Sequence, residues 1–565
     1  MDSSPLKHQQ NKKFDKKSSE LNRLLPSNAI PSSNFQQIPN DSYDEEQQEE
    51  KKEIADSETH DVDHQKLSVI ELEHFKDTET PPFSWRKLWM FTGPGILMSI
   101  AFLDPGNIEG DLQAGAIAGY SLLWLLLWAT IMGLMIQLLS ARVGVATGKH
   151  LAELCRAEYE PWARYLLWAM AEVAVIAADI QEVIGTAIAI QILTHGVLPL
   201  WFSVVITGAD CFVFLCFESY GVRKMEAAFA FMVATMAVSF AYMFADARPS
   251  AKELLLGILV PKLSSKTIQQ AVGVFGCIVS PHNIYLHSAL VQSRKIDTTK
   301  PSKVQEAINY NSIESSLALL ISFIINLFVT TVFAKGFHGT KSASEVGLAN
   351  AGRYLEEKYG GGVFPILYMW GIGLLAAGQS STITGTYAGQ FIMGGFLNLQ
   401  VKEWLRALIT RSFAIVPTMI LVIVFDTHSA MDVMNEALNV VQSMQIPFSL
   451  IPLFTIASKE EFMGVFRIGP PLQKVAWTMV ALVMVINCYV IYDFFMNVIS
   501  GGMSRLLFCA LSAGYVAFIT YLSSRDGACP PCWLYSILFQ RFSRVGGEKT
   551  IRSSRIEESQ DRPLV

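Results

Sequence analysis

The first eighty residues of this 565-residue chain lack any apolar run of the length that a cleavable signal peptide needs. They hold few large apolar side chains, and charged residues crowd the segment 44–53. Such a composition cannot bury enough apolar surface to offset the entropy that the chain loses on ordering. We therefore expect residues 1–80 to form a disordered tail.

Positive charge and paired cysteines are also scarce. The 44 Lys and Arg residues are outnumbered by 50 Asp and Glu residues. The sequence shows no basic face, so we expect no nucleic-acid partner. Of the eight cysteines, Cys529 and Cys532 have a metal-like spacing but no second pair to complete a zinc site, which favours lipidation or an ordinary loop. No motif indicates a soluble enzyme, and we expect neither enzymatic activity nor a resident cofactor.

Apolar sequence, by contrast, is abundant. Apolar residues make up 51% of the chain, and between residues 85 and 523 they form stretches of about 20 residues, the length that crosses a bilayer. This pattern predicts an all-α polytopic membrane protein with a transmembrane domain over 82–523 and a polar tail over 524–565. The twelve predicted spans are 88–118, 121–143, 164–194, 199–219, 225–245, 268–293, 311–335, 363–394, 404–425, 430–457, 474–497 and 504–523.

An even number of spans places both tails on one side of the membrane, and basic residues indicate which side. The short loops after the even-numbered spans up to the tenth carry Arg156, Arg223, Lys224, Arg294, Lys295, Lys402, Lys459 and Arg467. The positive-inside rule then predicts that both tails are cytoplasmic. Two longer loops, 246–267 and 336–362, carry basic residues on the other face together with acidic ones, and count against this orientation.

Two of the spans are interrupted in the same way. The first contains Asp104-Pro105-Gly106-Asn107 and the sixth contains Ser280-Pro281-His282-Asn283. Proline frees a backbone carbonyl one turn earlier, and a bilayer tolerates such unwound backbone only where it lines a cavity or meets a ligand. Paired breaks in corresponding positions of two halves indicate a binding site at the membrane midplane of an inverted-repeat transporter. The alternative is that both prolines only kink packed helices.

The groups at these breaks suit a cation. Asp104 supplies a carboxylate, Asn107 an amide oxygen, and the prolines free carbonyls near Ala101 and Cys277. Oxygen ligands around one negative charge favour a metal cation. A carboxylate inside a membrane span is expensive and is usually functional.

Three motifs in this chain resemble those of one known family. They are Asp104-Pro105-Gly106-Asn107, Pro281-His282-Asn283, and the segment 378–390 that contains Gln379, Gly385, Tyr387 and Gln390. All three are similar to motifs of the NRAMP transporters, and the resemblance runs over residues 82–522, with plant members looking closest. It implies a LeuT-like fold with two inverted five-helix repeats, about 88–245 and 268–457, followed by extra helices over 474–523.

The resemblance also implies a function. Members of the family drive the uptake of manganese, iron and related divalent ions, cadmium among them, with protons. By position, Asp104, Asn107 and the carbonyls of Ala101 and Cys277 look like the family's metal ligands, and Asn439 occupies the place of a further amide ligand. The glycine-rich segment 378–390 lacks the lysine and the strand of a nucleotide loop, which favours close helix packing and a mobile gate.

Ser280 departs from the family pattern, which has methionine before the second proline. A thioether is a soft ligand that favours manganese, iron and cadmium, whereas a hydroxyl is hard and has a shorter reach. We therefore expect weaker discrimination against magnesium. One alternative function is accordingly the transport of harder cations, magnesium or aluminium.

Proton coupling needs groups that titrate. Asp179 and Glu182, three residues apart, lie on one helix face where the family places its proton route, and we expect a proton to pass to them from Asp104. Arg411 is a candidate partner that keeps one of these acids charged. His282 and His287 are relay candidates, with hydrogen-bonded packing as the alternative for each.

Two other classes of function stay open at this point. A sodium-coupled amino-acid transporter would want a helix N-terminus free of acid, which Asp104 contradicts. A receptor or scaffold would carry a long C-terminal domain, whereas about forty residues follow the last span here. In the N-terminal tail, Glu20, Leu24 and Leu25 match an acidic dileucine signal read by adaptor proteins, so we expect a vacuolar or endosomal membrane, with the plasma membrane as the alternative.

Overall fold

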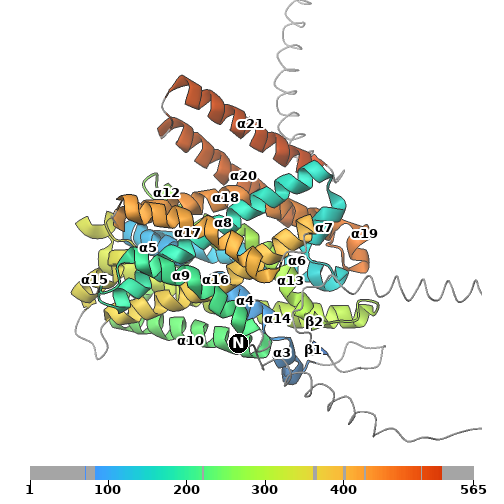
Figure 1. Ribbon diagram of the computed structural model, residues 1–565, viewed down its shortest axis with the longest axis horizontal. Coiled ribbons are helices and arrows are strands. Elements are labelled where there is room, and N and C mark those ends of the chain that lie inside the picture. The colour runs from blue at the N-terminus through green and yellow to red at the C-terminus, as the bar shows by residue number, and fades with distance from the viewer. Residues whose placement is uncertain are drawn as a thin grey trace, which may run out of the picture. The chain divides into compact units, whose positions relative to one another are not determined.

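The computed structural model describes residues 70–71, 83–218, 222–359, 366–398, 402–425, 428–497, 499 and 501–524, and in these ranges it is almost entirely helical (Figure 1). A short parallel pair, β1 (Ile70–Glu71) with β2 (Arg294–Lys295), is the exception. The sorting residues Glu20, Leu24 and Leu25 lie outside the described residues, as do Cys529 and Cys532.

Ten long helices make up most of the described chain. They are α6 (Leu123–Thr147), α8 (Pro161–Leu193), α9 (Leu200–Glu218), α10 (Val222–Ala247), α14 (Pro301–Phe337), α16 (Ile366–Leu397), α17 (Glu403–Phe425), α18 (His428–Ser458), α20 (Pro470–Asn497) and α21 (Gly502–Ser524). The shorter helices are α3 (Trp85–Phe91), α4 (Pro94–Ile100), α5 (Pro105–Ala118), α7 (Leu151–Glu158), α11 (Ala251–Leu259), α12 (Ile268–Ile278), α13 (Pro281–Leu290), α15 (Leu348–Tyr359) and α19 (Glu460–Met463). Single turns of 3₁₀ helix are η1 (Gly119–Leu122), η2 (Val291–Ser293), η3 (Lys341–Ser344) and η4 (Gly464–Phe466).

Each of the twelve predicted spans corresponds to one helix or to a broken pair of helices. The first span is the pair α4 and α5, and the sixth is the pair α12 and α13. By length and composition, seven helical stretches of the described residues could cross a membrane, with α5 and α6 counted as one. The largest error in a boundary is at α14, which begins ten residues before the predicted start of its span, at Pro301. Proline is well suited to the first turn of a helix because its missing N–H would have no helical partner there.

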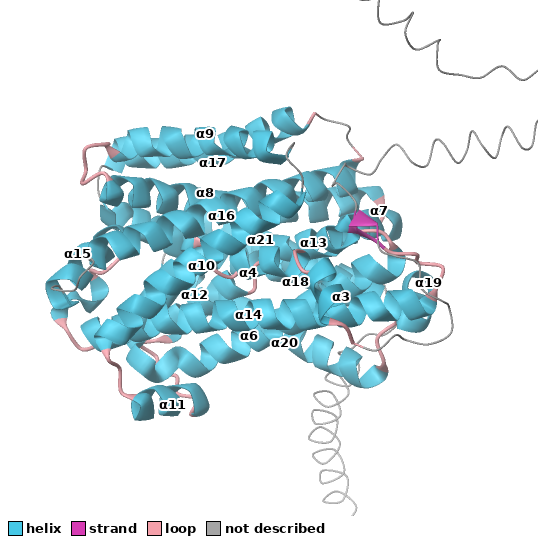
Figure 2. Cartoon of the chain, turned by 90° about the horizontal axis from the view of Figure 1, so that it is seen from below, coloured by secondary structure: helices cyan, strands magenta, loops and turns pink. Residues whose placement is uncertain are grey.

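Packing places the two broken pairs inside the bundle. Figure 2 shows α8, α16, α10, α14 and α6 in succession, and each of these helices packs against the next. The first broken pair contacts α14, and α12 contacts both α5 and α18. The hairpin α20–α21 lies at the edge and packs mainly on α18, with Leu506, Leu507 and Leu511 exposed. An apolar surface of this kind is what contact with lipid tails requires.

Candidate functional site

The first break is built by ordinary helix capping. Helix α4 ends at Ile100, α5 begins at Pro105, and residues 101–104 join them. Asp104 is the N-cap of α5, and one of its carboxylate oxygens accepts a hydrogen bond from the backbone N–H of Asn107 at 2.7 Å. Asp is among the preferred caps because its side chain satisfies a donor that the helix leaves free. Only part of the Asp104 carboxylate is engaged in this way, and the side chain is buried.

Asn107 gives the first break a second oxygen. Its side-chain N–H₂ donates to the Ala101 carbonyl at 3.4 Å, and its Oδ1 has no hydrogen-bond donor among the described residues although the residue is 0% exposed. A buried acceptor without a donor is unfavourable unless something else satisfies it. A cation held by Asp104 and Asn107 would do so, and the structure brings these two residues and Ala101 together.

Helix α14 supports the unwound segment from outside. Asn326 donates from Nδ2 to the Phe102 carbonyl at 2.9 Å, and Ser322 donates from Oγ to the Ser99 carbonyl at 2.9 Å. Glu314 accepts from the backbone N–H groups of Gly93 at 2.5 Å and Gly95 at 3.0 Å, where α4 begins.

Sequence reasoning missed Ser322 and Asn326 as supporting residues, whereas Glu314 fits the pairing with a helix end that a lone acid in a span predicts. The sequence feature that could have indicated this support is the recurrence of polar residues along one otherwise apolar span, at positions 314, 322 and 326. They satisfy backbone groups that a bilayer would leave unsatisfied.

At the second break one carbonyl is satisfied from within, whereas the buried side-chain amide of Asn283 has no hydrogen-bond partner among the described residues. Helix α12 ends at Ile278 and α13 begins at Pro281, and the Ser280 hydroxyl donates to the Cys277 carbonyl at 2.8 Å. The carbonyl expected to serve as a ligand therefore already accepts a hydrogen bond from the residue that replaces the family methionine. Helix α12 packs closely on α5, since a Cβ at Gly110 would lie 2.9 Å from the Cys277 Sγ.

Asn439, the amide expected from α18, is bound to α8. Its Oδ1 accepts from Gln181 Nε2 at 2.8 Å. The same Nε2 donates to the Asn435 carbonyl at 3.0 Å, and Gln442 Nε2 donates to Gln181 Oε1 at 2.6 Å. All four residues are buried. Sequence reasoning passed over Gln181 and Gln442, because an amide in a span is less conspicuous than a carboxylate.

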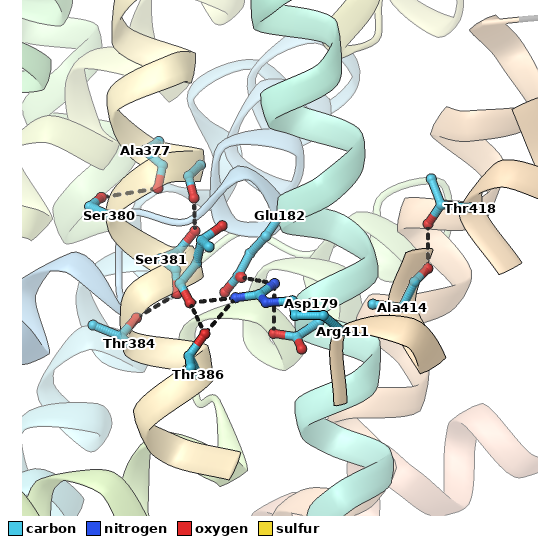
Figure 3. A network of polar contacts seen from close by, with 12 residues as sticks. Asp179, Glu182, Ala377, Ser380, Ser381, Thr384, Thr386, Arg411, Ala414 and Thr418 are labelled. Atoms are coloured by element: carbon cyan, nitrogen blue, oxygen red, sulfur yellow. Dashed lines mark hydrogen bonds and ion pairs between the residues drawn. The ribbon is translucent and has the colours of Figure 1, made fainter. Parts of the chain in front are cut away.

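A buried ionic cluster joins α8, α16 and α17 (Figure 3). One guanidinium nitrogen of Arg411 lies 3.3 Å from a carboxylate oxygen of Asp179 and 3.3 Å from one of Glu182. Its other terminal nitrogen donates to the Thr382 carbonyl and, at 3.1 Å, to Thr386 Oγ1. Breaking a buried pair leaves an uncompensated charge, so Arg411 and its two acids hold these three helices together as a unit.

The glycine-rich segment of α16 makes room for this cluster. A Cβ at Gly385 would lie 2.7 Å from an oxygen of Asp179 and 3.1 Å from one of Glu182. Tyr387 is buried and stacks on Phe391, with ring centroids 6.5 Å apart. Gln390 is buried and Gln379 is half-buried. Gly385 is therefore a position in this segment where a side chain would collide with the two acids.

The two histidines of α13 differ in their surroundings. His287 Nδ1 lies 3.0 Å from Gln137 Oε1, and its Nε2 lies 3.5 Å from Ser315 Oγ, so it has polar partners on both sides of the ring. His282 is buried, and its Nδ1 has no hydrogen-bond partner among the described residues. The packing alternative fits His287 better than His282.

Across the part of the chain that the structure describes, no three His, Cys, Asp or Glu side chains gather into a metal-binding group. A cation at the first break would depend on one carboxylate together with amide and carbonyl oxygens. Such ligands suit a cation that is bound and released more than one held permanently.

Comparison with known proteins identifies the chain. Residues 95–493 match the model of the natural resistance-associated macrophage protein-like (Nramp) family. Metal transporter Nramp2 of Populus trichocarpa is 64% identical over 94% of this chain and 98% of its own length. Metal transporter Nramp3.2 of the same organism is 70% identical over 80% of this chain and 90% of its own length.

A solved structure has the same fold. The manganese transporter of Eremococcus coleocola, determined as a point mutant, is 28% identical, with a TM-score of 0.71 over 79% of this chain and 96% of that one. The fold class expected from the sequence is thereby confirmed. The chain is an integral multi-pass membrane protein and belongs to the NRAMP family.

Proposed function

We propose that this chain is a secondary transporter that carries divalent metal cations, chiefly manganese and iron, together with protons into the cytosol. The observation that carries the proposal is the first break, where Asp104 and the unsatisfied amide oxygen of Asn107 are buried together. Relatives named metal transporters and a structural neighbour that is a manganese transporter support the same substrate class.

The ionic cluster supports proton coupling. Asp179 and Glu182 share one guanidinium group, so protonation of one acid would leave Arg411 paired with the other. We propose that protons leave Asp104 as the cation binds and move to this pair. His282 is the second relay candidate, since its ring is buried without a hydrogen bond to Nδ1 among the described residues.

A specific observation favours a second candidate, the transport of harder cations such as magnesium. The hydroxyl of Ser280 offers no thioether and engages the Cys277 carbonyl. The absence of a thioether weakens the preference of the site for soft ions.

The proposed location is a vacuolar or endosomal membrane with both tails in the cytosol, so that lumenal acidity would drive metal out of the compartment. The dileucine residues Leu24 and Leu25 support this location, and adaptor proteins would read them. Changing both to Ala should send the chain to the plasma membrane, as seen by fluorescence microscopy, and unchanged targeting would remove the support.

The test is uptake into proteoliposomes of Mn²⁺, Fe²⁺, Cd²⁺ and Mg²⁺, each with and without an inward proton gradient, for the wild type and for Asp104→Ala. We expect gradient-stimulated uptake of manganese or iron that disappears in the variant. Magnesium uptake equal to or above that of manganese would favour the second candidate. No uptake of any of these metals by correctly inserted protein would overturn transport and leave a receptor or scaffold.

A further inference from the structure

The carboxamide of Gln181 has a fixed orientation. Its Nε2 donates to the backbone carbonyl of Asn435 at 3.0 Å, which only the N–H₂ end of the amide can do. The same nitrogen lies 2.8 Å from the Asn439 side chain, so the atom of Asn439 that faces it is the oxygen. The oxygen of Asn439 is therefore directed at α8 in this state.

A single side chain of α8 holds one face of α18. Asn435, Asn439 and Gln442 are spaced by four and three residues, so they lie on the same face of their helix. Gln181 donates to the first two, and its Oε1 accepts from Gln442 Nε2 at 2.6 Å. These bonds are buried, where a polar group without its partner is costly.

Gln181 also lies against the cation-binding break. A Cβ at Gly106 would lie 2.5 Å from Gln181 Oε1 and 2.8 Å from its Cδ. Gly106 stands between Asp104 and Asn107 at the start of α5. The carboxamide of Gln181 thus occupies the space between the first turn of α5 and the amide face of α18.

We propose that Gln181 is a latch that holds Asn439 away from the cation. Asn439 reaches a cation at Asp104 and Asn107 only after its hydrogen bond to Gln181 has broken, and α18 then closes over the site. Gln181 is a positioning residue that acts through Asn439 and does not touch the cation itself. The inference rests on the proposed function, because it concerns binding of the transported metal.

The direction of the effect follows from the latch. Part of the free energy of cation binding goes into breaking the bond between Gln181 and Asn439, so removal of the bond should tighten binding. One net hydrogen bond corresponds to a change of about fivefold in an equilibrium constant. Gln181→Met removes the donor and keeps a side chain of similar length. This increase in cation affinity must disappear in a variant whose residue 439 cannot bind the cation.

The experiment is isothermal titration of Mn²⁺ into the purified full chain in detergent, for wild type, Gln181→Met, Asn439→Ala and the double variant. We expect Gln181→Met to lower the Kd about fivefold in the wild-type background and by less than about twofold in the Asn439→Ala background. In proteoliposomes the KM for Mn²⁺ should fall with the Kd, while the maximal rate should not rise. A purely structural role of Gln181 predicts instead the same loss in both backgrounds.

Other outcomes separate the two proposals. A Kd that is unchanged or raised by Gln181→Met, or lowered equally in both backgrounds, overturns the latch and leaves the proposed function standing. Absence of Mn²⁺ binding by the wild type overturns the proposed function and the latch with it. If Gln181→Met does not fold, Gln442→Met tests the latch from α18, because it removes the donor to Gln181 Oε1. The Kd should then fall about twofold to threefold, and an unchanged Kd again argues against the latch.

Discussion

The two helix breaks share a proline at the first helical position and differ in how their polar groups are satisfied. At the first break Asp104 bonds forward, to the backbone N–H of Asn107 in the helix that it caps. At the second, Ser280 bonds backward, to the carbonyl of Cys277 in the helix that has just ended. Each break leaves a buried asparagine oxygen without a donor among the described residues, that of Asn107 or of Asn283. The first break adds the carboxylate of Asp104, whereas the second is neutral and has its Cys277 carbonyl engaged by Ser280.

Support from neighbouring helices differs as well. Helix α14 binds the carbonyls of Ser99 and Phe102 and the N–H groups at the start of α4. At the second break, Ser280 bonds to a residue only three positions earlier, and α6 contributes one hydrogen bond, from Ser140 Oγ to the Ile284 carbonyl in the first turn of α13. The comparison teaches that equivalent breaks in two halves of a chain need not be equivalent chemically. Under the proposed function, the first would hold the charge that attracts a cation, and the second would tune which cation is preferred.

The largest expected effect is at the charge of the first break. Asp104→Asn keeps an N-cap of equal quality and removes only the negative charge. We expect Mn²⁺ uptake into proteoliposomes to fall more than about 100-fold, a loss of about 2.8 kcal/mol, while the thermal unfolding midpoint shifts by no more than a few degrees. The matched control is Asp111→Asn, which removes another buried carboxylate of α5 and should cost less than about tenfold. Uptake by Asp104→Asn above a tenth of the wild-type rate would contradict this assignment.

At the second break, we expect a change in the preference between soft and hard cations. Ser280→Met replaces a hard hydroxyl by a soft thioether and also releases the Cys277 carbonyl. We expect the ratio of Cd²⁺ to Mg²⁺ uptake to rise about tenfold. Ser280→Ala is the control, because it releases the carbonyl without adding sulfur. An unchanged ratio in Ser280→Met, or an equal rise in both variants, would show that the thioether is not what discriminates.

The smallest expected effect tests the support from α14. Asn326→Leu leaves the Phe102 carbonyl without its donor at nearly constant volume, so we expect the protein to lose about 1–3 kcal/mol of stability. The maximal rate of Mn²⁺ uptake should fall about fivefold, since the loop would no longer be held in place. Ser280→Ala, which removes the hydrogen bond to the Cys277 carbonyl three residues earlier, should cost less than about 1 kcal/mol in the same thermal unfolding assay. Equal losses would remove the distinction between external and internal support.

Much of the fold could be predicted because lipid permits few solutions. Long apolar stretches must form helices there, and Pro105 and Pro281 mark where two of those helices break. The acids Asp179 and Glu182 were conspicuous because charge is rare in a span. Their pairing with Arg411 followed from the rule that a buried charge needs a partner.

What the sequence did not reveal depends on tertiary contacts. Asn326 and Ser322 are unremarkable residues until α14 lies beside the unwound segment. The bond between Ser280 and Cys277 depends on the backbone path of the loop, which the residue types alone do not determine. Gln181 was passed over although it stands beside Glu182, because its role appears only once α18 and Gly106 are placed around it.

The adjacency of Gln181 and Glu182 has a kinematic consequence. Successive residues of an α-helix are separated by about 100° around its axis, and they cannot turn independently. Gln181 binds α18, and Glu182 pairs with Arg411 of α17. Any rotation of α8 about its own axis that loosened one of these attachments would therefore shift the other by the same angle. Binding of the cation and protonation of the acids would then be coupled by one rigid-body rotation of α8. No chain of hydrogen bonds between the two sites would be needed.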